Sequence, residues 1–211
     1  MKPLVSILIP TFNRPEHLLR AVRSAQLQSY PNIEIIVTDN SPLAATNQEL
    51  HRITDKRINY FKNNINLGAV SNWRKGLELA TGKYCVILSD DDFFINPFYI
   101  EEAVRIVEEN NVNLVITNCI LGYPNHCNIG SSNYSGLIKG NTFRAGFWNQ
   151  YWIPTISNMF NRNVAISLNA FHSNDILYSD IELWLNMMGG GEKFTVTNTH
   201  LFITDSMMKT L

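Results

Sequence analysis

The sequence lacks the features that mark membrane-spanning, secreted and nucleic-acid-binding proteins. No apolar run approaches the roughly 18 residues that a membrane-spanning helix needs, and the N-terminus has no charged region followed by an apolar region and a cleavage site. There are 17 lysines and arginines against 18 aspartates and glutamates, so a net charge of −1 offers no basic field to a polyanion. We therefore expect a soluble, cytoplasmic protein that does not bind nucleic acid.

Cysteine is also scarce. The three cysteines, Cys85, Cys119 and Cys127, are odd in number, and the first two lie in apolar runs. This arrangement favours reduced thiols in a core over disulfide bonds. His126 beside Cys127 has no second pair of ligands at zinc spacing, so a structural zinc site is not expected either.

The first half of the chain alternates between patterns that are typical of strands and of helices. Strands are predicted over residues 4–9, 33–38, 57–62, 84–88 and 113–118, and the continuous apolar runs at 4–9 and 84–88 indicate buried strands. Helices are predicted from apolar residues at helical spacing that begin near Asn13, Val70 and Pro97; Asn13 is placed to cap the first helix, and Pro15 suits its first turn. Such alternation implies crossover connections and an α/β domain with a mostly parallel sheet.

The second half is less regular. Between residues 122 and 146 neither period persists, which predicts a long loop region of the kind that often forms binding loops. Strands are predicted over residues 155–160 and 194–204, with a helix within 176–188. At 211 residues the chain is long enough for one sizeable core.

Three polar clusters each follow a predicted strand, at residues 11–14, 39–40 and 90–92. Parallel strands bring their carboxyl ends to one edge of the sheet, so these clusters are expected to meet there. The last cluster consists of three consecutive aspartates, which repel one another unless a divalent cation lies between them or they stay solvated. A solvated acidic turn is the alternative, but the three clusters together favour a pocket for a metal-bound phosphate that carries a hydrogen-bonding base.

The order of these segments resembles the family 2 glycosyltransferases, which are inverting enzymes with the GT-A fold. Val5-Ser6-Ile7-Leu8-Ile9-Pro10-Thr11-Phe12-Asn13-Arg14 looks like their first strand and nucleotide loop. Asn66-Leu67-Gly68 and Ala80-Thr81-Gly82-Lys83-Tyr84 look like the approach to their metal motif. The resemblance implies one GT-A domain, with a Rossmann-like, mostly parallel sheet, in which residues 1–98 bind the nucleotide sugar and a smaller lobe within 99–211 binds the acceptor.

The resemblance also implies roles for individual residues. It assigns the nucleotide-sugar site to Pro10, Thr11, Asn13, Arg14, Asn66 and Gly68. Asp39 would accept a hydrogen bond from the imide of uracil or thymine, and Asp90 would face the ribose. Asp91 would hold Mg²⁺ or Mn²⁺ between the two phosphates, and Asp92 would assist it.

The sequence departs from the family pattern at three positions. Ser89 stands where many members have the first acid of the metal motif. Trp73 occupies a position where an arginine is frequent, which leaves Arg74 or another group to contact the phosphate. Ser179 replaces an acid that usually precedes the catalytic base.

The segment Tyr178-Ser179-Asp180-Ile181-Glu182-Leu183-Trp184-Leu185 resembles the one in which these enzymes carry that base. Asp180 is therefore the expected base, and Glu182 would point to another side if the segment is helical. The alternative for Asp180 is a helix N-cap. Upstream, four aromatic residues would face the acceptor or join a core: Phe147, Trp148, Tyr151 and Trp152.

The resemblance implies a reaction in which a sugar moves from a UDP-sugar or dTDP-sugar to a hydroxyl of a glycan or lipid-linked acceptor. It places the protein in cell-surface polysaccharide synthesis, with peripheral association at the inner face of the membrane through the acceptor. Two alternatives remain open at this point. One is a catalytically inactive protein of the same fold that binds nucleotide sugars or glycans. The other is a sugar-1-phosphate nucleotidyltransferase, although the glycine-rich, basic N-terminal loop of those enzymes is missing.

Overall fold

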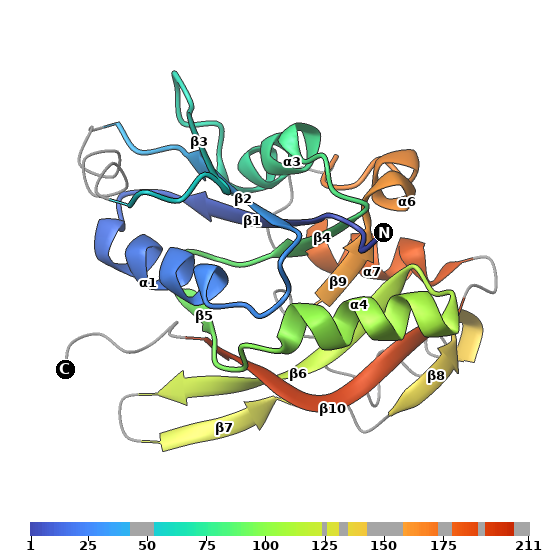
Figure 1. Cartoon of the computed structure of the whole chain (residues 1–211). Coiled ribbons are helices and arrows are strands. Elements are labelled where there is room, and N and C mark those ends of the chain that lie inside the picture. Colours follow the sequence, from blue (N-terminus) through green and yellow to red (C-terminus); the bar gives the residue numbers. More distant parts are fainter. Residues whose placement is uncertain are drawn as a thin grey trace.

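The computed structural model describes residues 1–42, 53–123, 126–130, 135–142, 158–172, 179–189 and 193–204. These residues form one ten-stranded sheet with helices on both faces (Figure 1). The strands are β1 (Val5–Thr11), β2 (Ile33–Asp39), β3 (Ile58–Lys62), β4 (Tyr84–Ile87), β5 (Asp92–Phe94), β6 (Leu114–Tyr123), β7 (His126–Gly130), β8 (Gly136–Lys139), β9 (Asn158–Asn161) and β10 (Lys193–Thr204). The helices are α1 (Pro15–Gln26), α3 (Ala69–Leu79), α4 (Tyr99–Asn110), α6 (Arg162–Ser167) and α7 (Ser179–Met187).

The sheet has a parallel half and a mixed half. Its order is β3-β2-β1-β4-β9-β6-β10-β5, with β7 added beside β6 and β8 beside β10. Strands β3, β2, β1 and β4 are all parallel, as the alternating sequence predicts. Strand β9 runs antiparallel to both of its neighbours, β4 and β6, while β10 is parallel to β6. The α/β class is therefore confirmed, and the parallel arrangement is confined to the first half of the chain and the β6–β10 pair.

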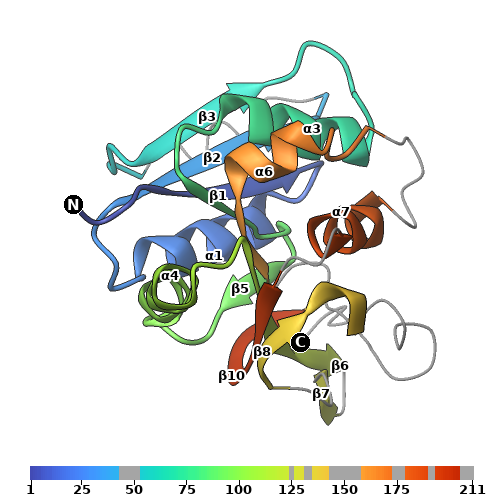
Figure 2. The same ribbon diagram turned by 90° about the vertical axis from the view of Figure 1, so that its right-hand side faces the viewer.

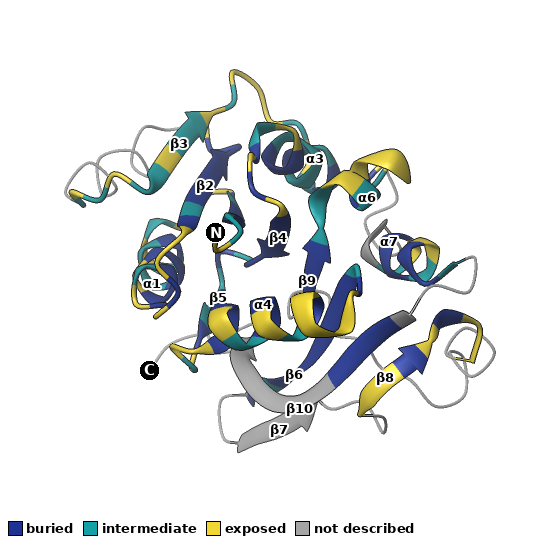
Figure 3. Ribbon diagram, turned by 45° about the vertical axis from the view of Figure 1, so that its right-hand side comes forward, coloured by how far each residue is buried: buried dark blue, intermediate teal, exposed yellow. Residues whose placement is uncertain are grey.

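The two faces of the sheet carry different helices. On one face, alternate residues of β1 such as Val5, Ile7 and Ile9 belong to a core cluster with apolar residues of α1 and α4. On the other face, Leu8 belongs to a cluster with residues of α3, α6 and α7. Figure 3 shows the buried strands between helices whose outer sides are exposed. Strands buried on both faces explain why the sequence of the first half reads as continuous apolar runs.

Helix α1 begins as predicted but is not capped as predicted. Pro15 is its first residue, while Arg14 is the N-cap and makes no side-chain capping hydrogen bond. Asn13 instead adopts a left-handed conformation with φ of 56°, which asparagine tolerates better than most residues. Its backbone N–H donates to Ser41 Oγ at 2.8 Å, so Asn13 turns the chain out of β1 and ties that turn to the end of β2.

The predicted loop region between residues 122 and 146 is wrong in part, because β7 and β8 lie within it. Both strands are short, and they are stabilised by pairing with β6 and β10, which a local sequence pattern does not reveal. Strand β5 and helix α6 were also not predicted. The predicted strand over 155–160 and the helix within 176–188 are found as β9 and α7, with residues 155–157 and 176–178 outside the described part.

Two further expectations can be compared with the described residues. Cys85 and Cys119 are buried free thiols, as expected, while the side chain of Cys127 lies outside the description. Within the part of the chain that the structure describes, no helix has both the length and the apolar character needed to cross a bilayer.

Candidate functional site

A cavity of about 490 Å³ lies at the carboxyl edge of the parallel strands, and we call it the strand-end cavity. Its walls come from the end of β1, from the turns after β2 and β4, and from the start of α3. The lining residues are Pro10, Thr11, Phe12, Arg14, Asn40, Asn66, Gly68, Ala69, Asn72, Trp73, Ser89, Asp90 and Asp91. The three polar clusters that follow the strands therefore do meet at one edge.

The structure brings together seven of the predicted site residues in this lining. These are Pro10, Thr11, Arg14, Asn66, Gly68, Asp90 and Asp91. Four predicted residues whose side chains are described do not line it: Asn13, Asp39, Arg74 and Asp92. The side chain of Asp180 lies outside the description. A second cavity of about 570 Å³, between α1 and β5, contains none of the predicted residues.

Asp90 is held at the back of the strand-end cavity by the end of β1. Its Oδ2 accepts hydrogen bonds from Thr11 Oγ1 at 2.7 Å and from the backbone N–H of Phe12 at 3.4 Å. Burial raises the pKa of Asp90 above its ordinary value, and the charge of Asp91 adds to the shift, although the hydrogen bond from Thr11 opposes it. Asp90 is thus a fixed carboxylate whose environment favours an added positive charge.

Asp91 is the more accessible of the two acids. Arg14 Nη1 lies 2.7 Å from Asp91 Oδ2 and 3.3 Å from Asp90 Oδ1, so one guanidinium bridges both carboxylates. The Arg14 side chain is 51% exposed, against 25% for Asp91 and 8% for Asp90. An ion pair with one half-exposed partner is weak, so Arg14 is free to exchange this contact for another.

The acidic segment is also fixed from behind. Arg20 Nη2 donates to the backbone carbonyl of Asp91 at 3.2 Å, and its guanidinium lies 4.7 Å from the centre of the Phe93 ring. Asp92 begins β5 and is buried, so it does not reach the strand-end cavity. The three aspartates are consecutive in the chain, but each of them has a different environment.

The paired acids fit a divalent cation that binds together with a phosphate. Mg²⁺ is usually bound through one or two carboxylates plus substrate phosphates, and Asp90 and Asp91 offer that number at the cavity. Among the described residues, no group of three or more histidine, cysteine, aspartate or glutamate side chains is placed to hold a metal by itself. The geometry suits a metal shared with a ligand better than a permanent metal centre.

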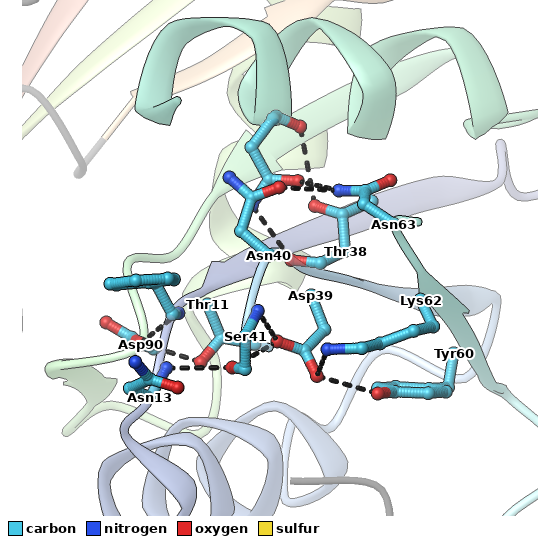
Figure 4. A network of polar contacts seen from close by, with 12 residues as sticks. Thr11, Asn13, Thr38, Asp39, Asn40, Ser41, Tyr60, Lys62, Asn63 and Asp90 are labelled. Atoms are coloured by element: carbon cyan, nitrogen blue, oxygen red, sulfur yellow. Dashed lines mark hydrogen bonds and ion pairs between the residues drawn. The ribbon is translucent and has the colours of Figure 1, made fainter. Parts of the chain in front are cut away.

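Asp39 has a different environment, shown in Figure 4. It is fully buried, and its Oδ1 accepts hydrogen bonds from both the backbone N–H and the hydroxyl of Ser41. Its Oδ2 accepts from Tyr60 at 2.7 Å and lies 3.4 Å from Lys62 Nζ. Burial, together with the hydrogen bond to Asp39, raises the pKa of Tyr60, so the phenol keeps its proton. A nucleotide base could form a hydrogen bond with the Asp39 carboxylate only by displacing one of these groups.

A network of asparagines, not predicted from the sequence, lies beside Asp39 (Figure 4). Asn63 Nδ2 donates to Asn40 Oδ1 and to Asn72 Oδ1, both at 2.8 Å. Asn72 Nδ2 donates to the carbonyl of Thr38 at 2.9 Å, and Asn40 Nδ2 donates to the carbonyl of Gly68 at 3.1 Å. The network ties β2, β3 and the start of α3 together. The only sign of this network in the sequence is Asn72, a polar side chain within an amphipathic helix.

The remaining predicted residues are distributed as follows. Arg74 Nε donates to the carbonyl of Phe171 at 2.8 Å, and Nη2 donates to the same oxygen, so the guanidinium points away from the strand-end cavity. Asp180 is the second residue of α7, not its N-cap, and its side chain lies outside the description. Residues 143–157, which include the four aromatic residues predicted to face the acceptor, also lie outside it.

Comparison with known proteins gives consistent matches. The family described as "Glycosyl transferase family 2" matches residues 6–167. A UDP-Glc:alpha-D-GlcNAc-diphosphoundecaprenol beta-1,3-glucosyltransferase, WfaP of Escherichia coli, is 28% identical over 92% of this chain and 74% of its own length. A GalNAc(5)-diNAcBac-PP-undecaprenol beta-1,3-glucosyltransferase of Campylobacter jejuni is 38% identical over 43% of this chain and 30% of its own length.

Solved structures share the fold at low sequence identity. Residues 1–349 of S. aureus TarS in complex with UDP-GlcNAc superimpose with a TM-score of 0.77 at 14% identity, over 94% of this chain and 57% of that one. A mannosyltransferase of Pyrobaculum calidifontis in complex with GDP-Man and Mn²⁺ gives 0.73 at 16% identity, over 99% and 59%. The chain thus spans less than two thirds of these two structures, and about three quarters of the first relative named above.

Proposed function

The chain belongs to glycosyltransferase family 2 and is a glycosyltransferase with the GT-A fold, and we propose that it transfers a sugar from a nucleoside diphosphate sugar to a hydroxyl of a lipid-linked acceptor. The single observation that carries the proposal is the pairing of Asp90 and Asp91 beside Thr11 and Arg14 at the strand-end cavity. This is where open α/β sheets bind ligands. The family assignment leaves no support for the nucleotidyltransferase alternative.

The proposed sugar donor is a UDP-sugar or a dTDP-sugar. Support comes from the UDP-sugar in the name of the E. coli relative and from the UDP-GlcNAc complex of the structural neighbour. In this proposal residues 1–98 hold the nucleotide, with Asn66 and Gly68 on the side of the cavity that the asparagine network stabilises. Asp39 fits a role in base recognition through the groups it fixes, Ser41 and Tyr60, more directly than through its own occupied carboxylate.

The diphosphate is proposed to lie against Thr11 and the acid pair. Mg²⁺ or Mn²⁺, bound through Asp91 and the phosphates, would supply Lewis-acid stabilisation of the charge on the leaving diphosphate. Hydrogen bonds from Thr11 and Phe12 hold the carboxylate of Asp90, the second member of the acid pair, in place. Arg14 is exposed enough to turn from Asp91 to a phosphate oxygen when the sugar donor enters.

Residues 99–211 are proposed to bind the acceptor, with Asp180 as the base. In this mechanism the Asp180 carboxylate takes the proton of the acceptor hydroxyl as that oxygen attacks the anomeric carbon. Attack from the face opposite the leaving diphosphate inverts the configuration. A positioned base of this kind typically contributes about 10² to 10⁴ in rate.

The acceptor is proposed to be a sugar linked through diphosphate to a polyprenol, because both curated relatives named above act on such substrates. A substrate of that kind is anchored in a membrane by its lipid. The protein would then meet the inner face of the membrane through its acceptor, in the synthesis of a cell-surface polysaccharide.

The test is a calorimetric titration with UDP and with dTDP, each with and without Mn²⁺. We expect metal-dependent binding of one nucleotide, lost in Asp91→Ala. The matched control is Asp55→Ala, because Asp55 also pairs with an arginine, Arg57, and does not line the strand-end cavity. If neither nucleotide binds in the presence of Mn²⁺, the proposed sugar-donor site is wrong.

A further inference from the structure

Trp73 lines the strand-end cavity. The adjacent Arg74 brings no cation to this part of the lining, because its guanidinium is engaged with Phe171 and does not line the cavity. The chain therefore presents an aromatic surface to the cavity at this position. A wall of this kind contacts a ligand through shape and dispersion, not through charge.

The indole of Trp73 is held from behind by Phe171. The two rings pack edge to face, with their centres 5.8 Å apart and their planes at 76°. Phe171 is 2% exposed and belongs to the core cluster that contains Leu183 and Trp184 of α7, with Trp73 packed against that cluster. Trp73 thus contacts the cavity on one side and the second half of the protein on the other.

Phe171 is itself held in an unusual conformation. Its φ of 60° lies in the left-handed region, which a bulky side chain adopts only when its surroundings impose it. Two N–H groups of Arg74 donate to the Phe171 carbonyl and hold the backbone in this conformation. The neighbouring Asn169 is also left-handed, with φ of 58°, so the chain turns sharply here before it leads on to α7.

The position of Trp73 indicates which part of a nucleotide sugar it meets. Successive helix residues point about 100° apart, and Asn72 already faces β2 through its bond to Thr38. Trp73 therefore faces round toward Phe171 and the cluster that includes Leu183 and Trp184 of α7. Figure 2 shows α6 and α7 next to α3. In an inverting transfer, the sugar lies between the diphosphate and the base. Asp180, the proposed base, is in α7, so the proposed function puts the sugar on the α7 side of the cavity, which is the side on which Trp73 packs against Phe171.

We propose that Trp73 is a specificity-determining residue, which packs against the ring of the transferred sugar, and that Phe171, locked by Arg74, is the residue that positions it. The inference rests on the proposed function. An indole face packs well on the C–H face of a pyranose and poorly on a face that carries an axial hydroxyl. The Trp73 ring therefore discriminates between epimers, which are sugars that differ in the direction of one hydroxyl.

The experiment compares three ligands by calorimetry in the presence of Mn²⁺: the nucleotide that the wild-type chain binds, UDP or dTDP, and its glucose and galactose derivatives. We expect Trp73→Ala to leave the affinity for the free nucleotide within about twofold. The affinity for the preferred sugar derivative should fall about threefold to tenfold, so that the preference between the two epimers narrows. Trp73→Phe, which keeps an aromatic face, should retain at least half of the preference.

Equal losses of affinity for the free nucleotide and for its sugar derivatives would overturn the inference about Trp73 but not the proposed function, because Trp73 would then contact the nucleotide. An unchanged preference between the epimers would also overturn it. A wild-type chain that binds neither nucleotide would overturn the proposed function and this inference with it.

The positioning step has its own test. Arg74→Gln should narrow the preference between the epimers by about half as much as Trp73→Ala, and Arg74→Lys, which retains one N–H donor group, should restore part of it. The matched control is Arg57→Gln, because Arg57 also donates to a backbone carbonyl, that of Gln26, but does not line the cavity. If Arg57→Gln narrows the preference as much as Arg74→Gln does, the effect is a general loss of stability, and the positioning role is wrong.

Discussion

Asp39 ends β2 and Asp91 follows β4, the two strands on either side of β1 in the parallel half of the sheet, yet their environments are opposite. The Asp39 carboxylate is fully buried and accepts four hydrogen bonds or ion pairs from Ser41, Tyr60 and Lys62. The Asp91 carboxylate is partly exposed and is paired with Arg14, a side chain that is half in solvent. The protein itself supplies every partner of the Asp39 carboxylate, whereas the Asp91 carboxylate remains accessible to the cation that we propose.

The difference shows how one sheet edge serves two purposes. Removing a partner from a buried, satisfied carboxylate is destabilising, because the groups that surround it lose their acceptor. Removing a partly exposed acid leaves little unpaired, but it removes the charge that a metal requires. We therefore expect stability and activity to separate between these aspartates, and the following predictions test that separation.

The largest effect on turnover is expected at Asp180, the proposed base on the acceptor side of the site. Asp180→Asn should lower turnover by about 10² to 10⁴, because an amide cannot take a proton from the acceptor. Binding of the nucleotide should remain within about twofold, since the carboxylate is proposed to act on the acceptor alone. Turnover with a lipid-linked acceptor and calorimetry with UDP would be compared. Turnover close to that of the wild type would exclude Asp180 as the base.

The second largest effect is expected at Asp91. Asp91→Asn should lower turnover by about 10³, because it removes the proposed metal ligand. Its free energy of unfolding should stay within about 0.5 kcal/mol of the wild type, as is usual for a partly exposed position. Urea denaturation checks the second part. A loss of more than about 2 kcal/mol would show that Asp91 is structural and that its contrast with Asp39 is wrong.

Asp39 should show the reverse. Asp39→Ala is expected to lower the free energy of unfolding by about 2–4 kcal/mol, because Tyr60, Lys62 and Ser41 lose a buried acceptor. Asp39→Asn should lose less, since its carbonyl still accepts hydrogen bonds. Urea denaturation at neutral pH measures both. Equal stability of Asp39→Ala and the wild type would contradict the buried network of Figure 4.

The contribution of Asp90 to stability should depend on pH, which gives a further test of the comparison. Burial raises its pKa in the folded protein, so the folded state holds the proton more tightly than the unfolded state does. Stability from this group is therefore lost as the pH rises through the range above the ordinary aspartate pKa. We expect Asp90→Asn to be more stable than the wild type at pH 7, with the difference shrinking as the pH falls to 4. Thermal denaturation across this range, without metal, would contradict the prediction if the variant is less stable at pH 7.

The smallest effect is expected at Arg14. In the absence of nucleotide the guanidinium competes with a metal for the acid pair, so Arg14→Gln should bind Mn²⁺ up to about fivefold more tightly than the wild type, in line with a weak surface ion pair. Titration of free Mn²⁺ by electron paramagnetic resonance measures this affinity. Weaker Mn²⁺ binding in the variant would show that Arg14 supports the metal site and does not compete for it.

The parallel half of the sheet could be predicted from the sequence because its signals are local. Continuous apolar runs identify buried parallel strands, and the carboxyl ends of such strands share one edge, so Thr11, Arg14 and Asp90 could be placed together without a structure. Two partners of Asp39, Tyr60 and Lys62, could not be foreseen, because they lie 21 and 23 residues further along the chain and depend on the register of β3. Arg74 finds its acceptor 97 residues away. Strands β7 and β8 likewise form only against partners that no local period reveals.

The pairing of β5 with β10 has a consequence for the synthesis of the protein. Asp92, the residue after the acid pair, lies opposite Thr204, at the end of the last strand described. During translation, the segment that carries Asp90 and Asp91 leaves the ribosome more than 100 residues before the strand that borders it. Contacts so distant in sequence form late in folding. A nascent chain therefore completes this edge of the sheet only after β10 has emerged, and we expect chains that still lack β10 to bind little nucleotide sugar at the proposed site.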